Sequence, residues 1–212
     1  DIHGMCGILN GTCNYILSRM SQDGSLFEDA LKKAQELGFA EAEPSLDVDG
    51  YDTAHKLAIL SALAHGMEIN LDDIHVEGIR NIGPADIGFA REFGYTIKLL
   101  AIGKKHQNHV EARVHPTMIH NSNPLSHVNH SMNAIAIDAD ATGRTMLYGH
   151  GAGMMPTASA VLSDIGDIAR NIITGTRRRV PTLGYPEENI QKIPILPMAQ
   201  LSTRYYLRFE AQ

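Results

Sequence analysis

The sequence predicts an α+β fold in which a mostly antiparallel or mixed sheet is covered on one face by helices. Apolar residues repeat at helical spacing through much of the first 94 residues, and β-rich runs separated by turn residues follow from Tyr95. Helices that come first and strands that come second are typical of this class. We expect residues 1–172 to form this domain and residues 173–212 to follow it as a separate segment.

The first half begins with a short strand over residues 2–9. A helix led by Thr12 is expected next and ends at Gly24. Ser25 is expected to cap a second helix, because Glu28 three residues later completes a capping box. After an acidic loop, the pattern predicts a third helix that opens at Asp52 and stops at Gly66, and a fourth that Pro84 leads.

The second half is expected to supply most of the sheet. Its predicted strands cover residues 95–105, 109–119, 132–140 and 143–149. A long helix from Pro156 to about Ile172 then carries an apolar stripe. Four prolines and little periodicity indicate that residues 173–204 form a linker, and residues 204–211 read as a strand.

Composition excludes several classes of protein. The 212 residues are 43% hydrophobic and carry a formal net charge of −6, which argues against a general nucleic-acid binder. The one basic run, residues 177–179, is expected to be a solvated part of the linker. Two cysteines without a CxxC pair indicate neither a disulfide framework nor a zinc site. With no membrane span and no secretory signal, we expect a cytoplasmic protein, cut from a longer chain because it begins without Met.

An acidic loop beside a single lysine is the most informative local feature. Lys56 lies on a helix that is apolar on nearly every side, so its side chain is expected to be at least half shielded from water. Asp52 lies one turn before it and is positioned to pair with it. The carboxylates of residues 40–52 are Glu41, Glu43, Asp47, Asp49 and Asp52.

The residues suggest three interpretations of this loop, of which the second fails on spacing. In the first, Asp52 caps the helix, Lys56 reaches the surface and the other carboxylates are solvated. A calcium loop is the second, but the twelfth position counted from Asp47 is Ala58 rather than Glu. In the third, the carboxylates hold the ammonium of an amino-acid substrate while Lys56 exchanges a proton with it.

Several ordered blocks of the sequence resemble the homoserine dehydrogenase family. They are GILNGTCNYILSRM, AQELGFAEAEPSLDVDGYDTAHKLAIL, YTIKLLAIG, RVHPTMI and YGHGAGMMPTASAVLSDIGDIAR, and the resemblance covers residue 4 to about residue 172. It implies an enzyme that interconverts L-homoserine and L-aspartate 4-semialdehyde with NAD or NADP. This reaction lies on the shared route to threonine, methionine and isoleucine.

The resemblance also assigns roles to particular residues. Lys56 would pass the proton to or from the terminal oxygen of the substrate, and Asp52 would orient Lys56. Glu41 would be the main ligand of the substrate ammonium, with Asp47 and Thr12 in the same pocket. Glu43 and Asp49 are the weaker candidates.

A glycine-rich loop that contains Gly149, Gly151 and Gly153 follows the last predicted strand. A Gly-x-Gly-x-Gly pattern alone most often means a plain turn, but the resemblance implies that this loop touches the cofactor. His150 stands where the family usually has proline. The dinucleotide-binding domain of the family has no counterpart here, so we expect the cofactor to be bound mainly by that domain and this chain alone to be inactive.

Two further expectations concern partners. RYYLRFEA resembles the opening strand of an ACT regulatory domain, and the resemblance implies a homodimer that forms through the sheet. A metal-binding or pH-sensing module is the alternative, because six histidines fall between residues 106 and 130. They form no HExxH motif and have no cysteine partner, so we expect scattered surface histidines and no metal.

Overall fold

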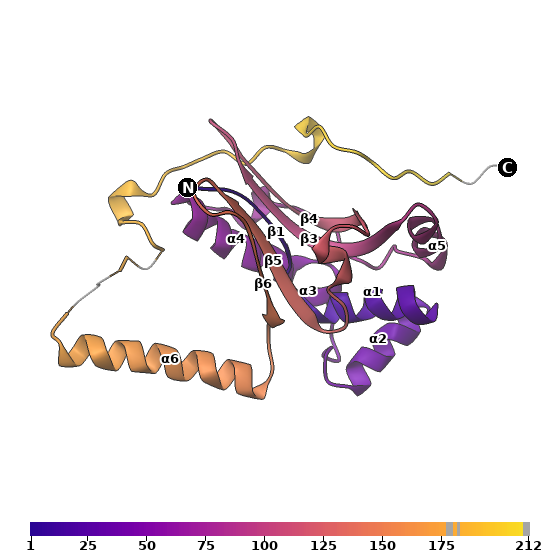
Figure 1. Cartoon of the computed structure of the whole chain (residues 1–212), viewed down its shortest axis with the longest axis horizontal. Helices are drawn as coiled ribbons and strands as arrows, with labels where there is room; N and C mark the ends of the chain where they lie inside the picture. Colours follow the sequence, from indigo (N-terminus) through magenta and orange to yellow (C-terminus); the bar gives the residue numbers. More distant parts are fainter. Residues whose placement is uncertain (177–179, 182, 210–212) are drawn as a thin grey trace.

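A computed structural model of the chain describes residues 1–176, 180–181 and 183–209. The described strands form one mixed sheet in the order β2-β4-β3-β1-β5-β6 (Figure 1). All neighbouring strands are antiparallel except β2 and β4, which are parallel. The strands are β1 (Ile2–Ile8), β2 (His75–Val76), β3 (Tyr95–Lys105), β4 (Val110–His120), β5 (Met132–Ala139) and β6 (Gly143–His150). The predicted α+β class is confirmed.

Helices cover one face of the strands at the centre of this sheet. The α-helices are α1 (Gly11–Asp23), α2 (Phe27–Glu36), α3 (Ser45–Val48), α4 (Tyr51–His65), α5 (Pro84–Glu92) and α6 (Met154–Ile173). Ile16 of α1, Leu57 of α4 and Ile87 of α5 share one buried cluster with Leu99 of β3. A smaller hydrophobic cluster lies on the opposite face of the sheet and contains Leu100 of β3. The segment between β4 and β5 covers this cluster.

Two predicted helix starts are wrong. The N-cap residue of α2 is Leu26 rather than Ser25, and no side chain in the described part of the protein caps this helix, so the predicted capping box does not form. Helix α4 begins at Tyr51, and its N-cap is Gly50, not Asp52. Gly50 has φ 90°, a left-handed conformation that glycine adopts readily. The first interpretation of the acidic loop therefore fails in its capping part, and Asp52 lies inside the first turn of the helix.

Helix α4 is buried along one face only. Ala54, Leu57 and Ser61 are buried, whereas Ile59 and Leu63 are exposed. The expectation of an all-round buried helix is therefore wrong. Lys56 is on the exposed part of the helix surface, where its environment depends on neighbouring loops rather than on the core.

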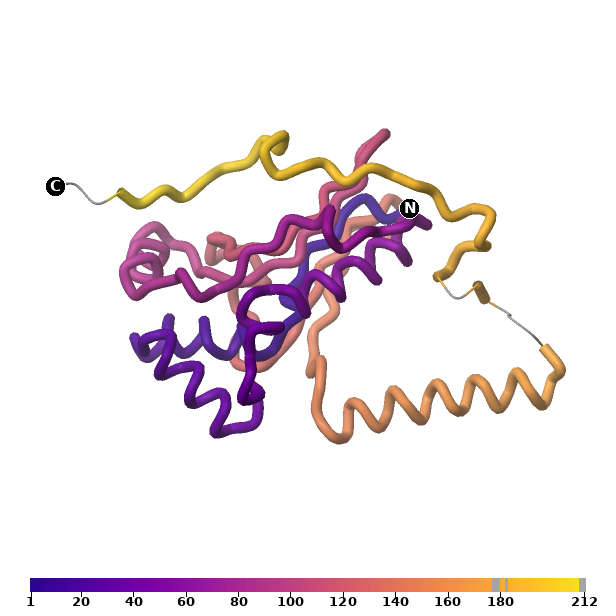
Figure 2. Tube along the Cα trace, turned by 180° about the vertical axis from the view of Figure 1, so that it is seen from behind, coloured from indigo at the N-terminus to yellow at the C-terminus, as the bar shows by residue number. Residues whose placement is uncertain are grey.

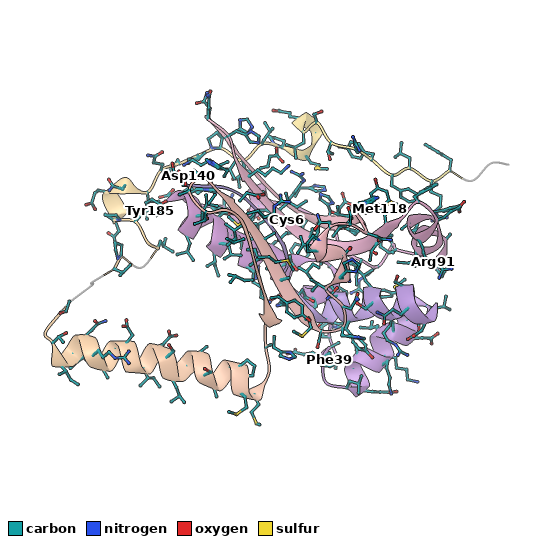
Figure 3. The ribbon with its side chains drawn as sticks, in the orientation of Figure 1. Cys6, Phe39, Arg91, Met118, Asp140 and Tyr185 are labelled. Atoms are coloured by element: carbon teal, nitrogen blue, oxygen red, sulfur yellow. The ribbon has the colours of Figure 1, made fainter. Side chains whose placement is uncertain are left out.

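Helix α6 leaves the body of the domain and covers none of the sheet (Figures 1 and 3). Its predicted apolar stripe is present, but Leu162, Ile165 and Ile172 are all more than half exposed. In the described part of the chain, none of the α6 residues is buried. A 20-residue helix with a bare apolar face needs a partner to bury it.

The C-terminal segment, residues 183–209, runs along one side of the domain from the end of α4 toward α5 (Figure 2). It forms isolated bridges, Met67 with Gln191 and Val110 with Ile195. Residues 201–209 form no strand, so the strand predicted over residues 204–211 is absent from its described part. The basic run 177–179 and the end of that predicted strand lie outside the described residues.

Candidate active site

Asn10 connects the carboxylates of the acidic loop at the end of β1. Its side-chain Nδ2 donates to Asp47 Oδ1 at 2.7 Å and to Asp52 Oδ2 at 2.9 Å. Its Oδ1 accepts from the Cys13 backbone N–H at 2.8 Å, which makes Asn10 the N-cap of α1. One buried amide thus fixes both carboxylates relative to the start of the helix.

Lys56 completes this cluster. Its Nζ donates to Asp52 Oδ2 at 2.6 Å and to the Leu9 carbonyl at 3.1 Å. The Lys56 side chain is 46% exposed, so just over half of it is shielded, and the Asp52 side chain is 24% exposed. An ammonium group has three N–H donors, and the described residues accept two of them. The third is available to a ligand.

Thr12 and Glu41 belong to the same region but are held differently. The Thr12 hydroxyl donates to the carbonyl of Phe39 at 2.6 Å, which ties the loop after α2 to α1; Phe39 is labelled in Figure 3. Glu41 follows on this loop, and its own backbone carbonyl accepts from Gln35 Nε2 at 3.0 Å. The Glu41 carboxylate is exposed and forms no hydrogen bond or ion pair within the described ranges. The loop is anchored, while its carboxylate is free for a cation.

Glu43 and Asp49 are occupied by structural contacts. Asp49 pairs with Arg80, whose Nε donates to Oδ1 at 2.5 Å. Glu43 Oε1 accepts from the backbone N–H of Ser45 at 3.0 Å, and the hydrogen bonds from Ser45 lower the pKa of Glu43. These contacts stabilise the short helix α3. They also show that both carboxylates bond to partners outside the Asn10 cluster.

The glycine-rich loop lies beside this cluster because of the strand register. Asn133 pairs with Gly149 across β5 and β6, and its side-chain Nδ2 donates to the Leu9 carbonyl at 3.3 Å. This carbonyl is also the one that accepts from Lys56. A Cβ placed on Gly151 would come within 1.9 Å of Asn133 Nδ2, so a side chain at position 151 would force the Asn133 amide to shift.

The loop fits a phosphate-bearing cofactor. Gly153 is the N-cap of α6, with φ 128° and no side-chain capping bond. The first N–H groups of this long helix therefore lack a side-chain acceptor, which is the usual arrangement for anion binding. Oδ1 of Asn133 is buried without a hydrogen-bond partner among the described residues. His150 is exposed at the end of β6.

The structure thus brings Lys56, Asp52 and Asp47 together through Asn10. It places Thr12 and the Glu41 loop at the start of α1, the helix that Asn10 caps. The sequence interpretation missed Asn10 and Asn133. An asparagine directly before a helical pattern is a typical N-cap, so Asn10 had a local signal. Asn133 had none, because its position depends on the pairing of β5 with its neighbours.

The histidines between residues 106 and 130 form separate contacts. His106 binds Glu111 at 2.8 Å, and His120 binds Ser122 at 2.7 Å. Burial lowers the pKa of His115, whose Nδ1 contacts the carbonyl of Pro116. Within the described ranges, no three His, Cys, Asp or Glu residues are grouped so that they could hold a metal ion.

Both cysteines are free thiols. Burial raises the pKa of Cys6 to about 11 and that of Cys13 well above its ordinary value. Of the helices in the parts of the chain that are described, none has both the length and the apolar content to cross a bilayer.

The fold and the site define an α+β domain with a lysine–carboxylate group at the end of its sheet. The family model described as homoserine dehydrogenase matches residues 1–165. The homoserine dehydrogenase of Neisseria gonorrhoeae is 47% identical over 211 residues, which is 100% of this chain and 48% of that protein. That of Helicobacter pylori is 51% identical over 202 residues, 95% of this chain and 46% of that protein. The chain belongs to the homoserine dehydrogenase family.

Solved structures agree with this assignment. A homoserine dehydrogenase from Thiobacillus denitrificans has a TM-score of 0.89 at 44% identity, over 94% of this chain and 46% of that one. A hyperthermophilic archaeal homoserine dehydrogenase in complex with NADPH has a TM-score of 0.65 at 30% identity, over 77% of this chain and 46% of that one. The chain spans about half the length of the curated relatives that it matches.

Proposed function

We propose that this chain is the substrate-binding and catalytic part of a homoserine dehydrogenase that interconverts L-homoserine and L-aspartate 4-semialdehyde with NAD or NADP. The observation that carries the proposal is the Lys56, Asp52, Asn10 and Asp47 cluster in a chain of this family. Homoserine has a hydroxyl that must lose a proton and an ammonium that requires anions. The cluster offers groups for both.

Lys56 is the acid–base group in this proposal. When homoserine is oxidised, the neutral amine of Lys56 takes the proton of the terminal hydroxyl and becomes an ammonium, and in the reverse direction the ammonium returns that proton to the carbonyl oxygen. Asp52 and the Leu9 carbonyl fix the position of the Lys56 amine and leave one of its positions open to the substrate oxygen. The nicotinamide, when bound, accepts or returns the hydride.

Glu41, Asp47 and Thr12 hold the substrate ammonium in this proposal. Among the described residues, the Glu41 carboxylate forms no hydrogen bond, and Asp47 uses Oδ1 for Asn10 while its other carboxylate oxygen accepts none. The Thr12 hydroxyl donates to Phe39 and keeps lone pairs that can accept from an ammonium N–H. Charge-assisted hydrogen bonds of this kind are the stronger class.

The cofactor contacts this chain at the loop of Gly149, Gly151 and Gly153. Its support is the uncapped start of α6 and the close approach of Gly151 to Asn133. This chain spans about half of the relatives' length, and in this proposal most of the cofactor site belongs to the other half. We therefore expect the 212-residue chain alone to be inactive.

The partner of the sheet is a second copy of this chain. Strand β6 is an edge strand of the sheet, and its Leu147 side chain is 65% exposed and that of Tyr148 60%. An unpaired edge with apolar side chains favours association with another sheet. For the bare stripe of α6 we propose cover by the remaining part of the enzyme.

The C-terminal segment leads to an ACT-like regulatory domain in this proposal. Its support is the resemblance of RYYLRFEA to the opening strand of such a domain. The segment is held on α5, where the Tyr206 hydroxyl and Arg208 Nε donate to Asp86 Oδ1 at 3.0 and 2.9 Å. We place the enzyme in the cytoplasm, which suits two unpaired thiols.

The deciding experiment is an assay of homoserine oxidation by the complete polypeptide, with NAD and NADP in turn. We expect reduction of at least one cofactor that depends on L-homoserine, and none with the 212-residue chain alone. Absence of homoserine-dependent reduction with both cofactors, in a folded complete polypeptide, would contradict the proposed function. Sedimentation at micromolar concentration tests the dimer, and a monomer there would contradict it.

A further inference from the structure

Asn133 lies where the proposed proton-transfer site meets the glycine-rich loop. It is the second residue of β5 and pairs with Gly149 near the end of β6. Its side-chain Nδ2 donates to the Leu9 carbonyl, just after the end of β1. Asn133 therefore contacts the end of β1 through its side chain and the end of β6 through its strand pairing.

The Leu9 carbonyl is shared by two donors. Asn133 Nδ2 approaches its oxygen to 3.3 Å and Lys56 Nζ to 3.1 Å. A carbonyl oxygen has two lone pairs and can accept both bonds. Because the Asn133 amide occupies one lone pair, the Leu9 carbonyl keeps a fixed direction toward Lys56.

The orientation of the Asn133 amide follows from its neighbours. Its Nδ2 must face Leu9, because an amide oxygen at that place would meet the carbonyl oxygen of Leu9. Its Oδ1 is then buried without a partner among the described residues, which is a cost that most proteins avoid.

Gly151 lies against the same amide group. A methyl group at position 151 would lie 1.9 Å from Asn133 Nδ2 and 2.8 Å from its Cγ. The backbone of Gly151 is not in the left-handed region, so its conformation would tolerate alanine. The collision is with the Asn133 side chain alone, so alanine at position 151 would displace the amide from its place beside Leu9.

We propose that Asn133 is a positioning residue that couples the glycine-rich loop to Lys56 through the Leu9 carbonyl. This inference rests on the proposed function, since it assigns Asn133 a role in the same proton transfer. A change at Gly151 or at Asn133 itself should therefore affect Lys56 through the Leu9 carbonyl, the acceptor that Asn133 and Lys56 share.

The first test uses Asn133→Ala and Asn133→Asp in the complete polypeptide. Asn133→Ala should lower kcat about 10-fold, the loss typical of one hydrogen bond, while the KM for homoserine changes less than about twofold because Asp47 and Thr12 are untouched. Asn133→Asp places a carboxylate near Lys56, so the kcat–pH profile of homoserine oxidation should move to higher pH by on the order of one unit.

Two controls separate positioning from simple folding. Asn70→Ala removes a comparable side-chain bond, from Asp72 N to Asn70 Oδ1 at 3.3 Å, on an exposed turn, and should leave kcat and its pH profile unchanged. In a Lys56→Ala background, Asn133→Ala should have almost no further effect, because both changes remove the same function.

The contact with Gly151 gives a readout that does not require activity. Gly151→Ala should lower the melting temperature, and the double variant with Asn133→Ala should recover to the value of Asn133→Ala alone, because the colliding amide is gone. A double variant less stable than both single variants would contradict a direct contact between position 151 and the Asn133 amide.

The possible failures are distinguishable. If Lys56→Ala impairs an active enzyme but Asn133→Ala keeps wild-type kcat and Asn133→Asp keeps the wild-type pH profile, the role of Asn133 is overturned and the proposed function stands. If the wild-type complete polypeptide does not oxidise homoserine, the proposed function falls, and the role of Asn133 in proton transfer falls with it.

Discussion

At the scale of single residues, the site depends on one amide that holds two carboxylates. Asn10 donates to Asp47 and Asp52, and Asp52 in turn pairs with Lys56. A carboxylate oxygen accepts hydrogen bonds, and an amide nitrogen donates two. The one Asn10 amide therefore holds both carboxylates in place beside the lysine.

Lys56→Ala in the complete polypeptide should lower kcat for homoserine oxidation by roughly 10² to 10⁴, the usual contribution of a general acid–base group. Steady-state kinetics measure this change. Lys33→Ala is the matched control, because Lys33 is also a helical lysine paired with a carboxylate, at 2.9 Å from Glu36, but lies on α2. Unchanged turnover in the Lys56 variant would remove the proton-transfer role.

Glu41→Gln should chiefly weaken substrate binding. Loss of a charge-assisted hydrogen bond to the homoserine ammonium costs about 1.5 to 3 kcal/mol, so KM should rise roughly 10-fold or more with a smaller effect on kcat. Glu43→Gln is the comparison, since Glu43 binds Ser45 N and should leave KM near that of the wild type. Equal KM values for both variants would argue against Glu41 as an ammonium ligand.

At the scale of elements, the start of α4 decides where Lys56 lies. Gly50 has φ 90° and closes the turn between α3 and α4. A Cβ there would approach Val76 Cγ1 to 3.0 Å and the Glu77 carbonyl oxygen to 3.3 Å. Strained backbone and crowding thus both favour glycine at this point of the chain.

Gly50→Ala should lower the free energy of unfolding by about 1 to 2 kcal/mol, because alanine in the left-handed region is strained. Gly88→Ala should act in the opposite direction and raise it by about 0.5 to 1 kcal/mol, since Gly88 lies inside α5 with nothing within 4 Å of an added Cβ. Urea unfolding of both variants measures the difference. A Gly50 variant as stable as the Gly88 variant would contradict the backbone argument.

At the scale of the whole molecule, a buried lysine ties helix α1 and the segment between β4 and β5 to the sheet. Lys98 in β3 is 1% exposed. Its Nζ donates to Asn14 Oδ1 at 3.0 Å, to the Val128 carbonyl at 2.6 Å and to Asn129 Oδ1 at 3.1 Å. All three acceptors are uncharged, and burial lowers the pKa of Lys98 to about 8.

This lowered pKa predicts a pH dependence of stability. Between about pH 8 and pH 10.5 the unfolded chain binds a proton at Lys98 that the folded chain has released, so the free energy of unfolding rises with pH. The rise from this residue is up to about 3 kcal/mol. Lys98→Met removes it, so the wild type should gain stability relative to the variant between pH 7.5 and pH 10.

Urea unfolding of both proteins at the two pH values measures this gain. The raised pKa values of Cys6 and Cys13 act in the opposite direction, but they are common to both proteins and cancel in the comparison. A stability difference between wild type and Lys98→Met that does not change with pH would contradict the assignment.

The sequence by itself determined the α+β class, most helices and strands, and the family, because these depend on periodicity and on ordered blocks of residues. It also indicated the pairing of Asp52 with Lys56, since an i, i+4 pair is set by helix geometry alone. It misplaced the starts of α2 and α4. The N-cap residues of these helices are Leu26 and Gly50, not the expected Ser25 and Asp52.

Only the tertiary structure decided what surrounds these residues. Strand register brought Asn133 to the Leu9 carbonyl and to Gly151, and the packing of α1 placed Asn10 between two carboxylates. The same packing left the apolar stripe of α6 bare, which periodicity alone cannot distinguish from a buried stripe. Local patterns specify elements, whereas contacts between distant segments depend on how those elements pack together.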